Sequence, residues 1–189
     1  VTNDKRFDYV AIDDRKAMCE ATEHLIGMGH RRLLYLIHDK RLPTTKLRIK
    51  GYRDATDGAK VDVIANIVQR DPGDAEFAQQ IAEIMFGTQP PTAIIASNSL
   101  VALSLVQILQ KLRILWPDDV ALLAFDEPVW APILSPPLSV VRHPTKEIAL
   151  EAWNRLLARV RTPGLRPKRI TLQAKLDPTA SVGRPKANA

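Results

Sequence analysis

Short apolar runs alternate with longer segments of helical periodicity along the first two thirds of the chain. In the segment that begins near Asp14, apolar residues recur at Ala17, Ala21 and Leu25, which is the spacing of one helix face. Helices are predicted at residues 14–28, 45–60, 74–86 and 100–112. The apolar runs around them predict strands at residues 9–12, 33–37, 63–68, 93–96 and 120–125. Wholly apolar strands joined by such helices are typical of right-handed βαβ units, so the pattern predicts an α/β fold with a parallel sheet covered on both faces.

The pattern changes after Phe125. Four prolines within residues 128–137 predict a stiff segment with little helix, followed by a short strand at residues 138–142. A helix at residues 145–160 and a last strand at residues 169–172 complete the predicted elements.

Composition places the chain among ordinary globular proteins. It has 189 residues, of which 46% are hydrophobic and 25% charged, enough for one domain or one two-lobed unit. Cys19 is the single cysteine, which excludes an intrachain disulfide and a zinc site built from cysteines. No apolar run approaches the ~18 residues of a membrane-spanning helix, so no membrane partner is expected. Because the chain begins at Val1 without a methionine or a signal-peptide pattern, we expect a fragment of a longer protein.

The net charge of +6 is unevenly distributed. Residues 61–141 hold 3 Lys and Arg against 9 Asp and Glu, whereas residues 142–189 hold 11 against 3. A basic end can attract nucleic acid or another acidic surface. The favoured interpretation is nevertheless a solvated basic face with a loose tail at residues 182–189, because this tail lacks aromatic residues that could stack on single-stranded nucleic acid.

Polar residues follow each strand of the predicted sheet. They are Asp13-Asp14, His38-Asp39, Asp71, Ser97-Asn98 and Asp126-Glu127. Ligands of open parallel sheets bind beyond the carboxyl ends of the strands, so these residues, with Arg48 in reach, predict a cleft for a polar ligand. Each position taken alone is explained more simply as a helix cap. Carboxylates, an amide and a guanidinium suit a polyhydroxylated or heteroaromatic small molecule, and Trp130 either covers the apolar side of that ligand or packs in the core.

Signatures of common enzymes are missing from the sequence. It contains no G-x-G-x-x-G, G-x-x-x-x-G-K-[ST] or G-x-S-x-G pattern, and its histidines lack the spacing of metal ligands. Adjacent carboxylates point in different directions from a strand end. Neither Asp13-Asp14 nor Asp126-Glu127 is therefore itself a catalytic pair. We therefore expect no enzyme activity, no cofactor and no metal.

Four blocks of the sequence together carry a family resemblance. They are Ile12–Asp14 with the helix that ends in His24–Arg32, then Thr44–Arg53, then Pro91–Asn98, and finally Pro117–Val120 with Ala124–Trp130, Leu134–Leu138 and His143-Pro144. The most specific parts are G-H-R-R and D-x-P-x-W-x-x-x-L-S-P-P-L. From about Val10 to Ser181 the chain resembles the effector-binding core of the lactose-repressor (LacI/GalR) family of bacterial transcriptional regulators.

The resemblance implies a type I periplasmic-binding-protein-like fold with one nearly complete lobe and part of a second. Residues 13–142 would form the C-terminal lobe, 1–12 and 143–175 would belong to the N-terminal lobe, and 176–189 would be the C-terminal crossover and tail. The rest of the N-terminal lobe and the domain that reads operator DNA would precede Val1. The family also implies a cytoplasmic homodimer whose sugar or purine-like effector binds between the lobes, shifts their orientation and so changes operator affinity.

The family's effector contacts map onto a small set of residues in this chain. These candidate effector-binding residues are Asp13, Arg48, Asn98 and Asp126, then His143 and Thr44. Trp130 is a further candidate, which rests on its aromatic ring and not on the resemblance. The resemblance favours Arg48 most, since its guanidinium would bridge ligand oxygens at the lobe junction. On this basis Arg48→Ala is expected to weaken effector binding by more than about tenfold and to leave the melting temperature nearly unchanged.

Two other functions stay open at this stage. An exported periplasmic sugar-binding receptor would have the same fold, although the G-H-R-R and L-S-P-P-L blocks favour the regulator. An enzyme on a flavodoxin-like sheet belongs to a different class and would need a cluster of catalytic groups, which the sequence does not offer.

Overall fold

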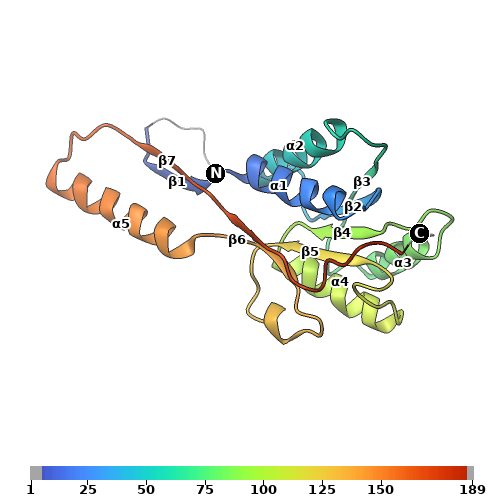
Figure 1. Ribbon diagram of the computed structural model, residues 1–189. Helices are drawn as coiled ribbons and strands as arrows, with labels where there is room; N and C mark the ends of the chain where they lie inside the picture. The colour runs from blue at the N-terminus through green and yellow to red at the C-terminus, as the bar shows by residue number, and fades with distance from the viewer. Residues whose placement is uncertain (1–5, 187–189) are drawn as a thin grey trace.

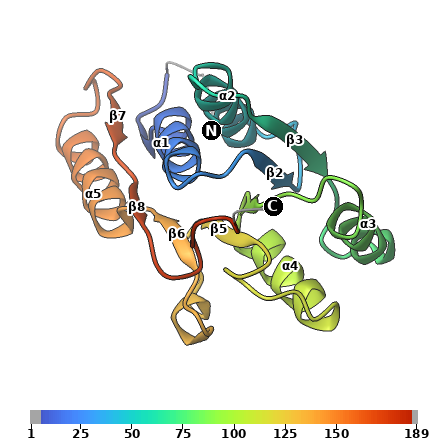
Figure 2. The same ribbon diagram turned by 45° about the vertical axis from the view of Figure 1, so that its right-hand side comes forward.

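The chain is divided between a six-stranded sheet and a separate two-stranded sheet. The computed structural model describes residues 6–186. Strands of the large sheet lie in the order β3-β2-β4-β5-β6-β8 (Figures 1 and 2). Their bounds are Arg32–Ile37 for β2, Ile64–Gln69 for β3, Ala93–Ala96 for β4, Ala121–Phe125 for β5, Ser139–Arg142 for β6 and Lys175–Asp177 for β8. All neighbours are parallel except β8, which runs antiparallel to β6.

Helices cover both faces of the large sheet. Helices α1 (Asp14–Gly27) and α2 (Pro43–Asp57) lie on one face, and α3 (Ala75–Met85) and α4 (Ser99–Lys111) on the other (Figures 1 and 2). Successive strand side chains point to opposite faces, so Leu34 packs with α3 and α4 while its neighbour Leu33 packs with α1 and α2. This double burial explains why the central strands β2, β4 and β5 are almost wholly apolar, and the predicted α/β architecture is confirmed.

None of the helices within residues 6–186 is both long and apolar enough to cross a membrane.

A smaller unit lies beside the large sheet. Strand β1 (Tyr9–Ile12) pairs in parallel with β7 (Arg169–Leu172), and α5 (Thr145–Arg161) packs against both (Figure 1). Two strands give little stability by themselves, and large apolar side chains of α5 such as Trp153 and Val160 are 57% and 70% exposed. The separation of the two sheets supports the division into lobes, which stays a prediction.

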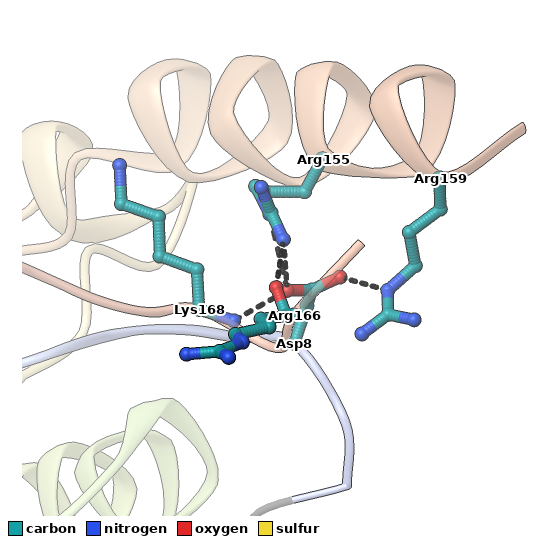
Figure 3. Close-up of polar contacts among 5 residues, drawn as sticks. All are labelled: Asp8, Arg155, Arg159, Arg166 and Lys168. Carbon is teal, nitrogen blue, oxygen red and sulfur yellow. Dashed lines mark hydrogen bonds and ion pairs between the residues drawn. The ribbon is translucent and has the colours of Figure 1, made fainter. Parts of the chain in front are cut away.

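Asp8 joins the three elements of this unit, which we call the β1–β7–α5 unit. Its Oδ1 accepts hydrogen bonds from Nε and Nη2 of Arg155, at 3.0 and 2.7 Å, and from the backbone N–H of Lys168 at 2.7 Å (Figure 3). Its Oδ2 accepts from Nε of Arg159. Burial raises the pKa of Asp8, but the hydrogen bonds from Arg159, Lys168 and Arg155 outweigh this effect and hold the pKa at about 2. One carboxylate thus connects the start of β1, the last turns of α5 and the start of β7.

The C-terminal segment packs against the large sheet. Ser181 is fully buried, donates to the carbonyl of Leu122 at 2.7 Å and accepts from the backbone N–H of Ser139 at 2.7 Å. Nε2 of the buried His30 lies 2.8 Å from the carbonyl oxygen of Gly183. The expected loose tail is therefore wrong for residues 182–186, while residues 187–189 lie outside the described part. The sequence pattern does not predict strand β8 either. This strand has only three residues, and its backbone pairing with β6, which is distant in the sequence, requires no apolar pattern.

We expect Ser181→Ala to lower the free energy of unfolding by about 1–3 kcal/mol, because the buried N–H of Ser139 then has no acceptor. Urea denaturation measures this change. Ser135→Ala, at an exposed serine, serves as the control and should change stability by less than about 0.5 kcal/mol. Equal effects of both substitutions would contradict a structural role of the C-terminal segment.

Asp8 predicts a pH dependence of stability. Its folded pKa lies below its ordinary value of 3.8, so the unfolded chain takes up the proton first as the pH falls. The stabilisation by Asp8 is thus fully present above about pH 4 and is lost as the pH falls towards 2. Asp8→Asn should be less stable than the parent at pH 7, and the difference should narrow towards pH 3 in urea titrations. A difference that is constant with pH, or shared by the exposed control Asp62→Asn, would refute this.

Candidate functional site

Arg48 and Asp14 form a buried ion pair at the carboxyl end of the large sheet. Nε of Arg48 donates to Oδ1 of Asp14 at 2.7 Å, and the two side chains are 11% and 2% exposed. Nη1 of Arg48 donates to the carbonyl of Ser97, directly after β4, at 2.8 Å. The guanidinium therefore ties α2 to α1 and to the end of a central strand.

The sequence explains why these two helices meet at this point. Gly51 lies one turn after Arg48, and a Cβ atom there would be 2.0 Å from the carbonyl oxygen of Arg15. Only glycine permits this close approach of α2 to α1. Asp14 shares the buried face of α1 with Ala17 and Met18, three and four residues later, and so points towards the sheet.

Phe125 and His143 extend the site across the next two strands. The guanidinium carbon of Arg48 lies 3.7 Å from the ring centroid of Phe125, a cation–π contact. The ring of His143, which follows β6, packs edge-on against Phe125 with centroids 5.5 Å apart. Nε2 of His143 is 3.1 Å from Oδ1 of Asp126, at an angle that makes no hydrogen bond. Asp126 follows β5 with a φ of 77°, the left-handed conformation that Asp tolerates better than most residues.

The site combines one positive and two negative charges with neutral polar groups. Burial lowers the pKa of His143; Asp126 opposes this effect and Arg48 adds to it. The net lowering keeps His143 neutral at pH 7, so its ring can donate and accept one hydrogen bond each. Burial also acts on Tyr35, where it raises the pKa of the hydroxyl group. Within residues 6–186 the Tyr35 hydroxyl and the Ser97 Oγ are buried without a hydrogen-bond partner.

Asp13 and Asn98 cap helices. The Asp13 carboxylate accepts from the backbone N–H of Lys16 at 3.0 Å at the start of α1. Oδ1 of Asn98 accepts from the N–H groups of Leu100 and Val101 at 3.0 and 2.9 Å at the start of α4. Both residues are therefore helix caps. Nδ2 of Asn98 makes no hydrogen bond among the described residues and stays available to a ligand.

Thr44 and Trp130 differ in their position relative to the ion pair, since Thr44 lies one helical turn before Arg48 on α2. Thr44 is half-buried in the first turn of α2. Trp130 precedes a 3-10 turn at Ala131–Ile133 and packs against the core on the α3–α4 face, opposite the face that carries Arg48. The structure thus brings Arg48, Asp126 and His143 together and places Trp130 with the core.

A groove of about 480 Å³ adjoins His143 where the chain passes between the two sheets. Its lining includes Glu127, Arg142, Lys146 and Gln173, which are all polar. Within residues 6–186 no group of three or more His, Cys, Asp or Glu side chains could hold a metal ion.

Sequence reasoning missed the Phe125 and Tyr35 side chains of this site and the role of Asp14 as the partner of Arg48. The pattern places Asp14 only at a polar strand end, yet its spacing to the apolar face of α1 could have identified it as the buried partner of Arg48. Phe125 and Tyr35 are strand residues within apolar runs, and nothing in those runs distinguishes a residue that contacts Arg48 from one that only fills the core.

The chain matches the family model described as periplasmic binding protein-like domain over residues 22–182. It is 30% identical over 169 residues to the probable opine utilization operon repressor of Rhizobium rhizogenes, a match that covers 85% of each chain. The chain spans about half the length or less of other curated relatives that it matches, which are named as transcriptional regulators or repressors.

Solved structures have the same fold. A LacI-type transcriptional regulator of Bacillus cereus is 28% identical, with a TM-score of 0.81 over 96% of this chain and 65% of that one. A LacI-family regulator of Enterococcus faecium with bound ribose is 20% identical, with a TM-score of 0.86 over 98% of this chain and 68% of that one. The implied periplasmic-binding-protein-like fold is therefore confirmed.

The burial of Arg48 changes what its substitution should do. Arg48→Ala leaves the Asp14 carboxylate buried without a partner, which should lower the free energy of unfolding by about 3–5 kcal/mol and lower the melting temperature. This replaces the expectation of a nearly unchanged melting temperature. Calorimetry and urea denaturation measure both quantities.

Arg41→Ala is the matched control, because Arg41 is 87% exposed and pairs with Asp39 in the same segment. Its loss should change stability by less than about 1 kcal/mol. The double substitution Arg48→Met with Asp14→Leu should recover much of the lost stability, since no charge is then left unpaired. An Arg48→Ala variant as stable as Arg41→Ala would rule out the buried pair.

Proposed function

The chain belongs to the periplasmic-binding-protein-like domain family, among the LacI-type regulators, and we propose that it is the part of a transcriptional repressor that senses a small-molecule effector. The observation that carries the proposal is the Arg48–Asp14 pair, with unpaired polar atoms of Tyr35 and Ser97 beside it, at the carboxyl end of a parallel sheet. Open parallel sheets bind their ligands at this end.

The candidate residues suit a switch as well as a binding site. The chain passes between the two sheets after β1, after β6 and after β7. Asp13 lies on the first of these connections and His143 on the second. A ligand that contacts these residues together with Asn98 and Asp126 favours one orientation of the two sheets over the other, and this difference in affinity is what shifts a conformational equilibrium.

The proposed effector is a sugar or a purine-like molecule. Carboxylates accept hydrogen bonds from hydroxyl groups, while the Asn98 amide and the neutral His143 ring each offer a donor. This mixture suits a ligand that carries several hydroxyl or ring nitrogen groups and no strong charge. The ribose bound to the Enterococcus faecium regulator supports the same class.

The whole protein's action on DNA is also a proposal. Relatives of this chain are named regulators or repressors of transcription, and the match to this chain covers only about half or less of several of them. We propose that a DNA-binding part outside these 189 residues reads the operator, and that the repressor works as a homodimer in the cytoplasm, where operator DNA is found. An exported sugar receptor is not favoured, because the relatives are named regulators of transcription. The same names support a binding function rather than an enzyme.

Thermal shift followed by calorimetry on pentoses, hexoses, disaccharides and purines tests this function, and we expect at least one of these compounds to bind. Asn98→Asp should keep the α4 cap and leave the melting temperature unchanged. It replaces the amide donor by an oxygen, so the affinity for the bound compound should fall by about tenfold or more. Asp74→Asn, which exchanges the same two groups at the cap of α3, should bind like the parent. If no compound in the panel binds, the effector-sensing proposal fails, and equal affinities of both variants would remove Asn98 from the site.

A further inference from the structure

We propose that the basic end of the β1–β7–α5 unit binds the phosphate backbone of double-stranded DNA. Between Glu151 and Asp177 the sequence has seven Lys and Arg and no Asp or Glu. The formal charge of this segment alone exceeds the +6 of the whole chain. The rest of the molecule is therefore close to neutral or acidic. Six of the seven cations belong to the β1–β7–α5 unit, and Lys175 lies in β8 of the large sheet.

The fold gathers these charges at one place. Arg155, Arg159 and Arg161 lie in the last half of α5, and Arg166 and Lys168 follow in the loop that leads into β7. In both views this end of α5 and its loop are the part of the unit farthest from the large sheet (Figures 1 and 2). The close-up shows the side chains of Arg155 and Arg159 reaching the single carboxylate of Asp8, whereas the side chains of Arg166 and Lys168 point away from it (Figure 3). With Arg161, which ends α5, five basic residues thus lie at the tip of the unit, and we call this the basic surface.

Asp8 neutralises only part of this surface. It pairs with Arg155 and Arg159, and Nη2 of Arg159 is still buried without a hydrogen-bond partner among the described residues. The side chains of Arg161, Arg166 and Lys168 are exposed and form no ion pair within residues 6–186. Arg161, Arg166 and Lys168 thus face solvent, while Arg155 and Arg159 are held in place by Asp8. Unpaired cations that face solvent are what attracts a polyanion.

A purely structural explanation covers only some of these residues. Basic side chains in the last turn of a helix stabilise its C-terminal dipole, which accounts for Arg159 and Arg161. It does not account for Arg166 and Lys168, which lie beyond the helix. Phosphate groups spaced along a duplex would contact both sets, and guanidinium groups match phosphate oxygens in paired hydrogen bonds.

Duplex DNA is favoured over an anionic lipid surface because the relatives of this chain are named repressors, and repressors act on DNA. Contact with the backbone carries no sequence information but fixes position and adds affinity. This inference goes beyond the effector site and does not depend on it, since neither Arg48 nor any other candidate effector residue takes part.

The test is fluorescence anisotropy of the 189-residue chain with a mixed-sequence DNA duplex of about three helical turns, at low and at physiological salt. We expect salt-dependent binding. Arg161→Gln, Arg166→Gln and Lys168→Gln combined should weaken it by at least about tenfold at low salt. The slope of log affinity against log salt should fall by roughly 0.9 for each phosphate that the variant no longer neutralises.

The matched control is the combination Lys50→Gln, Arg53→Gln and Lys60→Gln, which removes the same charge from exposed positions on and just after α2. It should bind DNA nearly as the parent does. If both variants lost the same DNA affinity, the net charge of the chain alone would explain the loss and the proposal would be overturned. An absence of binding at low salt would overturn it as well. Preference of the parent chain for vesicles containing anionic lipid over the duplex would assign the surface to a membrane instead. Circular dichroism of both variants confirms that they fold.

Discussion

The ion pair between Arg48 and Asp14 is the contact around which the candidate site is organised. A guanidinium and a carboxylate leave water only when each finds a partner, so burial of one requires burial of the other. Here the requirement fixes α2 against α1, and the close approach is possible because Gly51 has no side chain. The same guanidinium donates to the carbonyl of Ser97 and lies over Phe125, so one side chain contacts two helices and the ends of two central strands. Whatever binds at this edge of the sheet meets groups that are already held in place.

A second charged contact performs a comparable task in the β1–β7–α5 unit. That unit has two strands and one helix with several exposed apolar residues, too little to form a core of its own. Asp8 compensates by accepting hydrogen bonds from Arg155, Arg159 and the backbone of Lys168, which keeps β1, α5 and β7 together. The two contacts differ in burial and in excess charge. The Arg48–Asp14 pair is balanced and buried, whereas the Asp8 cluster is strongly basic and lies near the surface.

The large sheet could be predicted closely because its central strands β2, β4 and β5 are buried on both faces and its helices on one. Burial on this scale leaves an unmistakable pattern of apolar positions, and the predicted elements differ from the observed ones only at their ends. The C-terminal segment escaped prediction for the opposite reason. Its hold on the sheet comes from backbone pairing in β8, from the hydroxyl of Ser181 and from the carbonyl of Gly183 that meets His30, and none of these produces a hydrophobic pattern.

The sequence by itself determined the α/β class, the order of the elements and the edge of the sheet where polar residues collect, because these follow from local periodicity and from the direction of parallel strands. It also singled out Arg48, whose contact with an effector stays a prediction, but not that Asp14 rather than Asp13 is its ion-pair partner. Only the tertiary structure decided which side chains lose water and meet. Such contacts join residues that are far apart in the chain, and the choice between a helix cap, a core residue and a ligand contact depends on neighbours that no local pattern records.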